Sequence, residues 1–250
     1  MKFFLWRIGN VYGYLFGWPF MRMLHVAVID LSLHALGYDN LLSSWSGEEW
    51  FVRSILAPSN PKVCIDVGAN VGQYTKLLVE NTGAHIYAME PSASSFTELK
   101  KQAGDRVTPL HMACADRDGE AILHSRADCD EKASLDGLVN KGARKERVSV
   151  TKLSSFLHMQ GLGSVDFVKI DTEGFEKEVL QGLHPIRPRF VQFEFNIHHL
   201  YRSVTMLDLA NELSEYDLYR LVPHGWLPID PKKYIDSLYR FSNIIAVRRV

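Results

Sequence analysis

The chain has 250 residues, of which 46% are hydrophobic, and its formal net charge is −1. This composition provides ample material for a buried core, and the length allows one large domain or two small ones. A net charge so close to zero argues against a nucleic acid held mainly by charge, so we expect no nucleic-acid partner.

The three cysteines are odd in number and lack the spacing of a metal site. One of them, Cys64, falls in a predicted buried strand. We therefore interpret Cys64, Cys114 and Cys129 as reduced thiols and expect the protein to be cytoplasmic.

The start of the chain is unusually rich in aromatic side chains. Arg7 and Asn10 interrupt its apolar run and no small-residue cleavage site follows, so it is not a convincing secretory signal. Residues 20–36 are also apolar, but two charged residues and two histidines argue against a spanning helix, which needs about 20 mostly apolar residues. We expect an N-terminal helical extension over residues 1–44 and one domain over residues 45–250, because no linker divides the rest.

Apolar residues from Leu24 to Ala35 recur at helical spacing, and Gly37 ends the pattern. This helix has two interpretations. It packs over the main domain or against a second subunit of a homodimer, or it belongs to an aromatic-rich segment that docks peripherally on a membrane. Amphipathic helices usually pack on protein, so we favour packing.

The string Ser-Gly-Glu-Glu at residues 46–49 is typical of a helix start, with a capping box from Ser46 to Glu49. Pro58 ends this helix before the next strand. Glu48 can alternatively reach toward a ligand at the motif that follows, although capping and the helix dipole explain an acidic residue here.

The first informative motif is Val-Cys-Ile-Asp-Val-Gly-Ala-Asn-Val-Gly at residues 63–72. Its apolar run predicts a buried parallel strand, and a helical pattern over residues 73–80 follows the glycine-bounded turn. Gly68 and Gly72 allow a sharp turn and close approach of a ligand to the helix N-terminus. The spacing differs from that of dinucleotide-binding motifs, and Asp66 would repel a pyrophosphate and attract a cation.

This motif resembles the first motif of class I S-adenosylmethionine (SAM) methyltransferases, whose cofactor is a sulfonium cation. Glu90 ends the next predicted strand, eighteen residues after Gly72, and its carboxylate can bind both ribose hydroxyls. The residues that we expect to bind SAM are Asp66, Gly68, Ala69, Asn70, Gly72, Glu90, Pro91, Ala115, Asp116 and Asp171.

Strands and helices continue to alternate beyond this point. Ser92 can cap a helix that runs to about residue 103, and residues 107–112 read as a third strand. In the following segment, residues 113–116, an adenine could lie against small side chains with Asp116 near its amino group. The alternative is an ordinary turn after the strand.

Residues 120–125 and 147–151 alternate like strands and are expected to pair. Between them, residues 128–145 are polar and charged. We interpret this stretch as a surface loop, with a substrate lid as the alternative.

A second motif, Val-Asp-Phe-Val-Lys-Ile-Asp-Thr-Glu-Gly at residues 165–174, is an apolar strand that ends in three ionisable residues at alternate positions. The next strand, residues 190–195, adds Glu194 and is followed by two histidines. Alternatively, the histidines are surface residues and one acid lies at a helix start. The candidate catalytic residues are Lys169, Asp171, Glu173 and His198.

Three strings together resemble the FkbM-type family of SAM methyltransferases. They are Lys-Ile-Asp-Thr-Glu-Gly-Phe-Glu from residue 169, Asp-Val-Gly-Ala-Asn-Val-Gly from residue 66, and Ser-Gly-Glu from residue 46. The resemblance covers about residues 45–248, except for residues 128–145, which match poorly. It implies a Rossmann-like α/β fold with a mostly parallel seven-stranded sheet, helices on both faces and an antiparallel last strand.

The resemblance also implies O-methylation of a small-molecule or glycan acceptor, often a sugar hydroxyl. It implies SAM contacts at Asp66, Gly68, Asn70 and Glu90, and a polar active-site edge at Asp171 and Glu173.

Methyl transfer to a hydroxyl requires alignment of the acceptor oxygen and removal of its proton. In one version of the mechanism Asp171, Glu173 or His198 accepts this proton. In the other version Asp171 and Glu173 hold Mg²⁺, with Glu194 or a histidine assisting. We favour the version without metal slightly.

The last third of the chain is expected to complete the sheet. Residues 204–213 have helical spacing, residues 217–222 read as a strand, and residues 241–247 read as the final strand. A long loop over residues 223–239 carries aromatic residues that suit a sugar face or only cover the sheet edge, namely Trp226, Tyr234 and Tyr239.

Two other functions are alternatives. One is a SAM-fold protein without catalysis that acts as an assembly or membrane-docking module, and the other is a nicotinamide oxidoreductase. The presence of Lys169, Asp171 and Glu173 together argues against the first. Asp66 and the spacing of Asn70 in its turn argue against the second.

Overall fold

The computed structural model describes residues 2–40, 42–125, 135 and 144–249. Its central feature is a sheet of eight strands. The bounds of these strands are β1 Val63–Val67, β2 His85–Met89, β3 Val107–Leu110, β7 Phe167–Ile170, β8 Phe190–Phe195, β9 Tyr216–Val222, β10 Gly225–Pro228 and β11 Ser242–Arg248.

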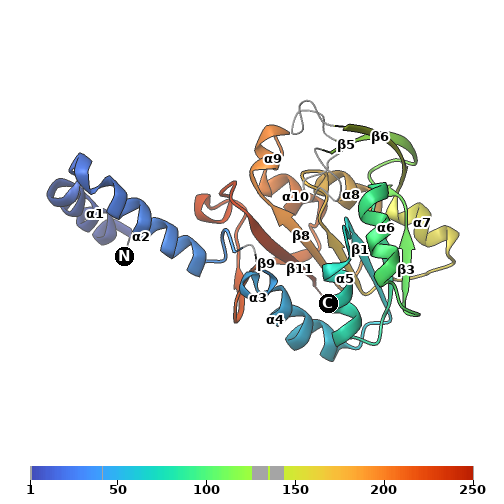
Figure 1. Ribbon diagram of the computed structural model, residues 1–250. Helices are drawn as coiled ribbons and strands as arrows, with labels where there is room; N and C mark the ends of the chain where they lie inside the picture. The colour runs from blue at the N-terminus through green and yellow to red at the C-terminus, as the bar shows by residue number, and fades with distance from the viewer. Residues whose placement is uncertain (1, 41, 126–134, 136–143, 250) are drawn as a thin grey trace.

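The strand order in this sheet is β10-β9-β11-β8-β7-β1-β2-β3 (Figure 1). Neighbours from β3 to β8 are parallel, and β11 lies antiparallel between β8 and β9. The expected class I arrangement, with its last strand inserted antiparallel, is therefore confirmed.

The sheet has one strand more than the expected seven. The sequence predicts only a loop after β9, but the chain turns back and pairs as β10, with Gly225 opposite Val222. The ring of Trp226 stacks on that of Tyr219 at 4.8 Å. This aromatic contact gives the added edge strand an apolar anchor.

Helices and short helical turns surround the sheet. Their bounds in the body are α3 Ser43–Ser46, α4 Glu48–Phe51, η2 Val52–Leu56, η3 Ala57–Ser59, α5 Gln73–Asn81, α6 Ala93–Gln102, α7 Leu153–Met159, α8 Glu176–Leu183, α9 Ile197–Tyr201, α10 Met206–Glu212 and η4 Tyr234–Asp236.

Successive residues of each central strand point to opposite faces, so the sheet has a core on each side. On one face Ile65 and Val168 pack with side chains of α7, α8 and α10. On the other face Cys64 and Phe167 pack with side chains of α4, η2 and α5. This double burial explains why β1, β7 and β8 are almost continuously apolar in sequence.

A second, small sheet consists of β4 (Ala113–Cys114), β5 (Gly119–Ser125) and β6 (Arg144–Thr151) in the order β4-β6-β5. β5 and β6 are antiparallel, which confirms the expected pairing. The predicted surface loop between them, residues 128–145, lies almost entirely outside the described residues, as does Cys129. Cys64 and Cys114 are buried free thiols, and burial raises the pKa of both.

The predicted capping box at Ser46 is wrong. Gly47 lies between α3 and α4 with φ of +86° and is itself the N-cap of α4. A Cβ on Gly47 would lie 2.4 Å from the carbonyl oxygen of Val222, so the body leaves room only for glycine here. Glu48 consequently turns toward Ser46, whose Oγ donates to its carboxylate at 2.9 Å.

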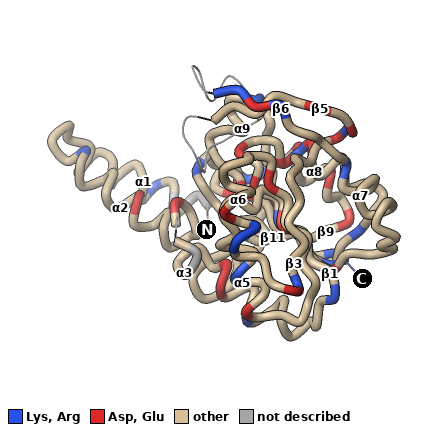
Figure 2. Tube along the Cα trace, turned by 45° about the vertical axis from the view of Figure 1, so that its right-hand side comes forward, with Lys and Arg blue, Asp and Glu red and all other residues tan. Residues whose placement is uncertain are grey.

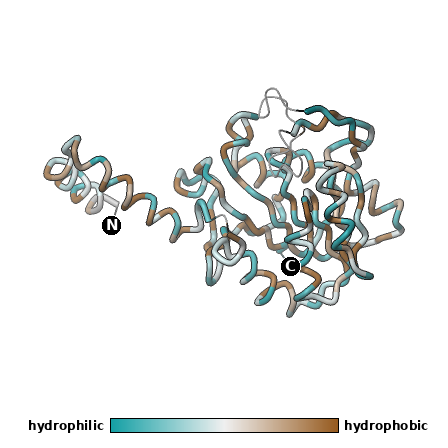
Figure 3. The backbone as a smooth tube through the Cα atoms, in the orientation of Figure 1, coloured by the Kyte–Doolittle hydropathy of each residue, from teal (hydrophilic) through white to brown (hydrophobic). Residues whose placement is uncertain are grey.

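Two N-terminal helices, α1 (Lys2–Phe16) and α2 (Arg22–Ala35), are joined by the turn η1 (Pro19–Met21) and project from the body as a hairpin (Figures 1 and 3). Among its described side chains, Leu33 alone is buried. The expectation that this segment packs over the main domain is therefore wrong, because only the last turns of α2 reach the body. Within the described part of the chain, no helix is both long and apolar enough to span a membrane.

Candidate functional site

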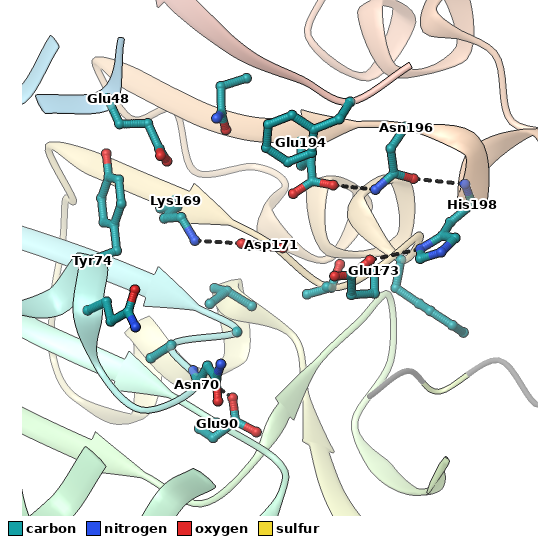
Figure 4. Close-up of a pocket in the computed structure, with 18 of the residues that line it drawn as sticks. Glu48, Asn70, Tyr74, Glu90, Lys169, Asp171, Glu173, Glu194, Asn196 and His198 are labelled. Carbon is teal, nitrogen blue, oxygen red and sulfur yellow. Dashed lines mark hydrogen bonds and ion pairs between the residues drawn. The ribbon is translucent and has the colours of Figure 1, made fainter. Parts of the chain in front are cut away.

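A cavity of about 870 Å³ lies at the carboxyl ends of β1, β2, β7 and β8. This is the edge where ligands bind in open α/β sheets, and the volume suits a small molecule. The turn after β1 and the acid after β2 form one half of the cavity. Acidic and amide side chains after β7 and β8 form the other half (Figure 4).

The turn after β1 depends on Gly68, which lines the cavity with φ of +78°. A Cβ on Gly68 would lie 1.7 Å from the carbonyl oxygen of Asp171, so glycine is needed to bring the ends of β1 and β7 together. Gly72 does not line the cavity. Its φ is +92°, and a Cβ there would contact Leu99 of α6 at 2.8 Å, which indicates a packing role.

Asp66 is fully buried and does not line the cavity. Its carboxylate accepts a hydrogen bond from Thr75 Oγ1 at 2.6 Å, which ties β1 to α5. The other carboxylate oxygen of Asp66 lies 4.0 Å from Lys169 Nζ. Burial raises the pKa of Asp66, although Lys169 and Thr75 oppose the shift.

Glu90 lines the cavity beside the glycine turn. Its two carboxylate oxygens accept hydrogen bonds from the backbone N–H groups of Asn70 and Ser92, each at 2.8 Å. Burial raises the pKa of Glu90 to about 7, although these hydrogen bonds lower it. Ala69 and Pro91 lie on either side of this contact and also line the cavity.

The predicted adenine segment reaches the cavity only in part. Ala113 and Cys114 line it, but Ala115 and Asp116 do not. Ala115 is buried against Gly182, whose added Cβ would lie 2.0 Å from the Ala115 carbonyl oxygen. Asp116 is exposed, and its carboxylate lies 3.5 Å from Arg117.

Lys169 and Asp171, at the end of β7, form an ion pair of 2.9 Å inside the cavity. Lys169 is 6% exposed. Burial alone would lower the pKa of Lys169, but Asp171, Asp66 and Glu48 outweigh burial and raise it. Lys169 is therefore a permanent cation that three carboxylates surround.

A hydrogen-bonded chain crosses the wall beside this pair. Tyr74 Oη donates to Gln192 Oε1 at 2.6 Å, and Gln192 Nε2 donates to Glu48 Oε1 at 2.7 Å. Lys169 Nζ also lies 4.9 Å from the centre of the Tyr74 ring. Burial raises the pKa of Glu48, with Lys169, Ser46 and Gln192 opposing the shift.

Glu173 and His198 form a second pair in the cavity, with Glu173 Oε2 2.8 Å from His198 Nδ1 (Figure 4). Glu173 has φ of +54°, a conformation that is uncommon outside glycine. Burial raises the pKa of Glu173, and His198 opposes the shift. A strained backbone that aims a carboxylate at a histidine is typical of a functional site.

Glu176 holds the loop that carries Glu173. Its carboxylate accepts hydrogen bonds from the N–H groups of Thr172 and Gly174 at 2.9 and 3.0 Å, and it lies 2.9 Å from His199 Nε2. Burial alone would raise the pKa of Glu176, but His199 and these hydrogen bonds outweigh it and lower the pKa to about 2. His199 is thus a buried structural partner and does not line the cavity.

Glu194, from β8, completes the acidic half of the cavity. Asn196 Nδ2 donates a short hydrogen bond to it, and Asn196 Oδ1 accepts from the N–H of His198 at 2.8 Å. Burial raises the pKa of Glu194 well above its ordinary value, and Asp171 and Glu173 raise it further. Burial and the two neighbouring acidic residues thus all favour the protonated form of Glu194.

The sequence profile of the "Methyltransferase FkbM domain" matches residues 66–220, which is more than half of the chain. The chain belongs to the FkbM methyltransferase family. It is a SAM-dependent methyltransferase, and the alternative of a nicotinamide oxidoreductase is wrong.

Two curated methyltransferases are similar to this FkbM chain. The 2-O-methyltransferase NoeI of Sinorhizobium fredii is 24% identical over 194 residues, which cover 70% of this chain and 79% of NoeI. The hexuronic acid methyltransferase AglP of Haloferax volcanii is 26% identical over 179 residues, which cover 69% of this chain and 70% of AglP.

Among solved structures, the O-methyltransferase TomG of Streptomyces achromogenes in complex with SAM is 8% identical. It has a TM-score of 0.46 and covers 82% of this chain and 81% of its own. We draw no conclusion about this chain from a similarity this low. The fold of the FkbM chain is instead established by its strand order and directions.

The residues of the FkbM cavity fit SAM. Asn70 Oδ1 is buried, and no hydrogen-bond partner is recorded for it among the described residues, so it can accept from a bound amino or hydroxyl group. Each carboxylate oxygen of Glu90 has a free lone pair beyond its backbone contact, so it can accept a further hydrogen bond from a ribose hydroxyl. Asp171 lines the cavity at the end of β7, where its backbone carbonyl lies close to Gly68 in the turn after β1.

The predicted Mg²⁺ site is not supported. Asp171, Glu173 and Glu194 all line the cavity, but each carboxyl group has a basic or amide partner of its own. Throughout the described ranges, no three His, Cys, Asp or Glu side chains are placed to hold a metal ion.

Sequence analysis missed the part of the FkbM site that comes from distant elements. Asn196 and Asn243 were given no role, yet both line the cavity. For Glu48 the capping interpretation was preferred to the alternative of a ligand contact, and its side chain lines the cavity. The one available signal for Glu48 was the Ser-Gly-Glu string of the family resemblance.

Proposed function

We propose that this methyltransferase transfers the methyl group of SAM to a hydroxyl group of a sugar or saccharide. The observation that carries the proposal is the Glu173–His198 pair, which shares one cavity with Asn70 and Glu90. The activities named for NoeI and AglP, a 2-O-methyltransferase and a hexuronic acid methyltransferase, support it.

The half of the cavity that is formed after β7 and β8, which we assign to the acceptor and call the acceptor half, suits a saccharide. Glu48, Asn196 and Asn243 offer donors and acceptors in place of water, and Tyr239 adds an aromatic ring. A few convergent polar groups with an aromatic surface are what a hydroxylated ring requires for orientation. Glu194 adds a carboxyl group that also lines this half of the cavity.

Bound SAM supplies an electrophilic methyl carbon on a positively charged sulfur. The chain must align the acceptor hydroxyl with that carbon and accept its proton. When Nδ1 of His198 donates to Glu173, Nε2 is the basic nitrogen, and Glu173 stabilises the positive charge that develops on the ring. Proton removal is therefore assigned to His198.

Asp171 has a different role in this proposal. Lys169 donates a hydrogen bond of 2.9 Å to one oxygen of its carboxylate, which holds this carboxylate in place inside the cavity. We therefore assign Asp171 to orienting the bound molecules. The proposed reaction needs no metal, since each carboxyl group in the acceptor half has another partner.

The test is turnover of SAM with a panel of mono- and oligosaccharides. His198→Asn should lower kcat by about 10²–10⁴, the usual cost of losing a general base, while the SAM affinity from calorimetry stays unchanged. His158→Asn, an exposed histidine of α7, is the matched control and should leave kcat unchanged.

Three results would contradict parts of this proposal. Full turnover by His198→Asn with loss in Asp171→Asn would move the base to Asp171. Loss of activity in EDTA that Mg²⁺ restores would establish the metal version. Methylation of non-sugar hydroxyls with no transfer to any saccharide would exclude the proposed acceptor class.

A further inference from the structure

The N-terminal hairpin, residues 2–35, carries most of the uncovered apolar surface of the protein. Of the 25 large apolar side chains that are exposed among the described residues, 16 belong to this hairpin. They include the two aromatic residues of its turn, Trp18 and Phe20, which are 59% and 78% exposed. The hairpin is brown along much of its length in Figure 3.

These side chains point in all directions around the helices. Tyr14, Leu15 and Phe16 are consecutive and all exposed, as are Met23 and Leu24 in α2. Consecutive residues of an α-helix are about 100° apart, so no single face of the hairpin contains them. A helix that is apolar on every side needs apolar surroundings on every side.

Several polar side chains of the hairpin have hydrogen-bond partners within it. His25 Nε2 lies 2.9 Å from the carbonyl oxygen of Phe16, and Tyr12 Oη lies 3.2 Å from His25 Nδ1. Ser32 Oγ donates to the carbonyl oxygen of Val28 at 2.8 Å. Internal pairing of this kind is what an apolar medium demands, because water is not there to accept or donate.

The charge of the hairpin is basic. Figure 2 shows few charged positions along it, and its sequence contains three basic residues, Lys2, Arg7 and Arg22, and one acidic residue, Asp30. Asp30 lies where α2 joins the body and pairs with Arg240 at 3.1 Å. The basic residues therefore belong to the projecting part, and the acidic residue belongs to its attachment.

We propose that the hairpin docks in one leaflet of an anionic lipid bilayer. Its apolar side chains enter the boundary between headgroups and acyl chains, and Arg7 and Arg22 extend to lipid phosphates. Helices of 15 and 14 residues are about 22 Å long, shorter than the roughly 30 Å of a bilayer core, so the hairpin does not span it.

A second copy of the chain fits these observations less well. A dimer contact covers one side of the hairpin, whereas the apolar side chains lie on all sides. Two basic hairpins would also repel each other, while anionic lipid attracts them. The attachment of the hairpin lies beside the cavity, because Arg240 joins Asp30 of the hairpin to Asp39 and both Arg240 and Asp39 line the cavity.

The experiment is co-sedimentation of the full chain with vesicles of phosphatidylcholine mixed with phosphatidylglycerol, and with vesicles of phosphatidylcholine alone. The wild type should sediment with the mixed vesicles, more weakly with phosphatidylcholine, and less as salt is raised. The double variant Trp18→Ala/Phe20→Ala should lower the partition coefficient roughly tenfold or more, because two large apolar side chains leave the lipid.

Arg22→Glu tests the contribution of the basic charge. It should lower binding to the vesicles that contain phosphatidylglycerol and leave binding to pure phosphatidylcholine vesicles unchanged. Tyr234→Ala, which removes an aromatic residue of the body that is 83% exposed, is the matched control and should sediment like the wild type. Calorimetry with SAM should give the same affinity for all four proteins, which shows that the variants are folded.

Three results would overturn the proposal. The first is that the wild type does not sediment with either kind of vesicle, and the second is that Trp18→Ala/Phe20→Ala binds vesicles as well as the wild type does. The third is that the wild type does not bind vesicles but forms a dimer in sedimentation velocity, and that this dimer dissociates in Trp18→Ala/Phe20→Ala, which would assign the hairpin to a second copy of the chain.

Discussion

Glu90 lies between two backbone donors, the N–H groups of Asn70 and Ser92, at a place that water barely reaches. Burial raises its pKa to about 7. We propose that Glu90 binds the ribose of SAM: its ionised carboxylate would then accept hydrogen bonds from both ribose hydroxyls, whereas the protonated form has fewer free lone pairs. Cofactor binding therefore favours loss of the proton.

The affinity for SAM should rise as the pH increases through about 7 and become constant above it, because protonation competes with binding below the pKa. Glu90→Gln should bind SAM more weakly by about 1–3 kcal/mol at high pH and should not show this pH dependence. Calorimetry from about pH 6 to about pH 8.5 measures both effects. A pH-independent affinity in the wild type would contradict the assignment of Glu90.

Gly68 is less suitable for testing SAM binding. A side chain there would collide with the backbone of Asp171 at the end of β7, so Gly68→Val would disturb the junction of two central strands. Loss of SAM binding in that variant would report on the fold, and Glu90→Gln separates the two effects.

At the scale of elements, the loop after β7 is fixed by α8 and α9. Glu176, in the first turn of α8, accepts from the backbone of residues 172 and 174 and contacts His199 of α9. Its pKa of about 2 is below its ordinary value, so the folded state favours the charged carboxylate. A depressed pKa of this kind stabilises the fold above the ordinary pKa and loses that contribution as the pH falls.

Glu176→Gln should lower the free energy of unfolding by about 3 kcal/mol at neutral pH. The difference from the wild type should shrink as the pH falls from about 5 toward 2, where Glu176 becomes protonated in both states. Urea denaturation at a series of pH values measures this difference. The exposed Glu120→Gln is the control, and a constant gap between wild type and Glu176→Gln would refute the proposed charge.

At the scale of the whole molecule, the hairpin and the body are nearly independent. The hairpin touches the body through Leu33 and the Asp30–Arg240 ion pair, while the two cores of the sheet lie entirely in the body. The projecting part thus contributes little to the packing that stabilises the catalytic domain.

Deletion of residues 1–28, which keeps Asp30 and Leu33, should leave the Tm of the body within about 2 °C of the wild type, because almost no buried area is lost. Differential scanning calorimetry in the absence of lipid measures it. A Tm lower by about 5 °C or more, on the order of 2 kcal/mol, would show that the hairpin packs on the body.

The amino-acid sequence by itself determined the order of the strands and helices around the site, the two motifs and the position of the cavity, but not the added edge strand β10. These features are local: the continuous apolar runs around Ile65 and Val168 predict strands buried on both faces, and glycines mark the turn that follows β1. Parallel strands bring their carboxyl ends to one edge, so Glu90, Asp171 and Glu173 could be assigned to one site before any contact was known.

Only the tertiary structure decided which of these side chains face the cavity and what faces them from elsewhere. Asp66 and Asp171 both belong to strand ends, but packing directs Asp66 to Thr75 in the core and Asp171 into the cavity. Glu48 reaches the site from a helix far away in sequence, through a hydrogen bond to Gln192. Sequence patterns report periodicity within one element, whereas the direction of a side chain depends on what packs against it. The helical spacing of α2 therefore could not show that the hairpin projects from the body instead of packing over it.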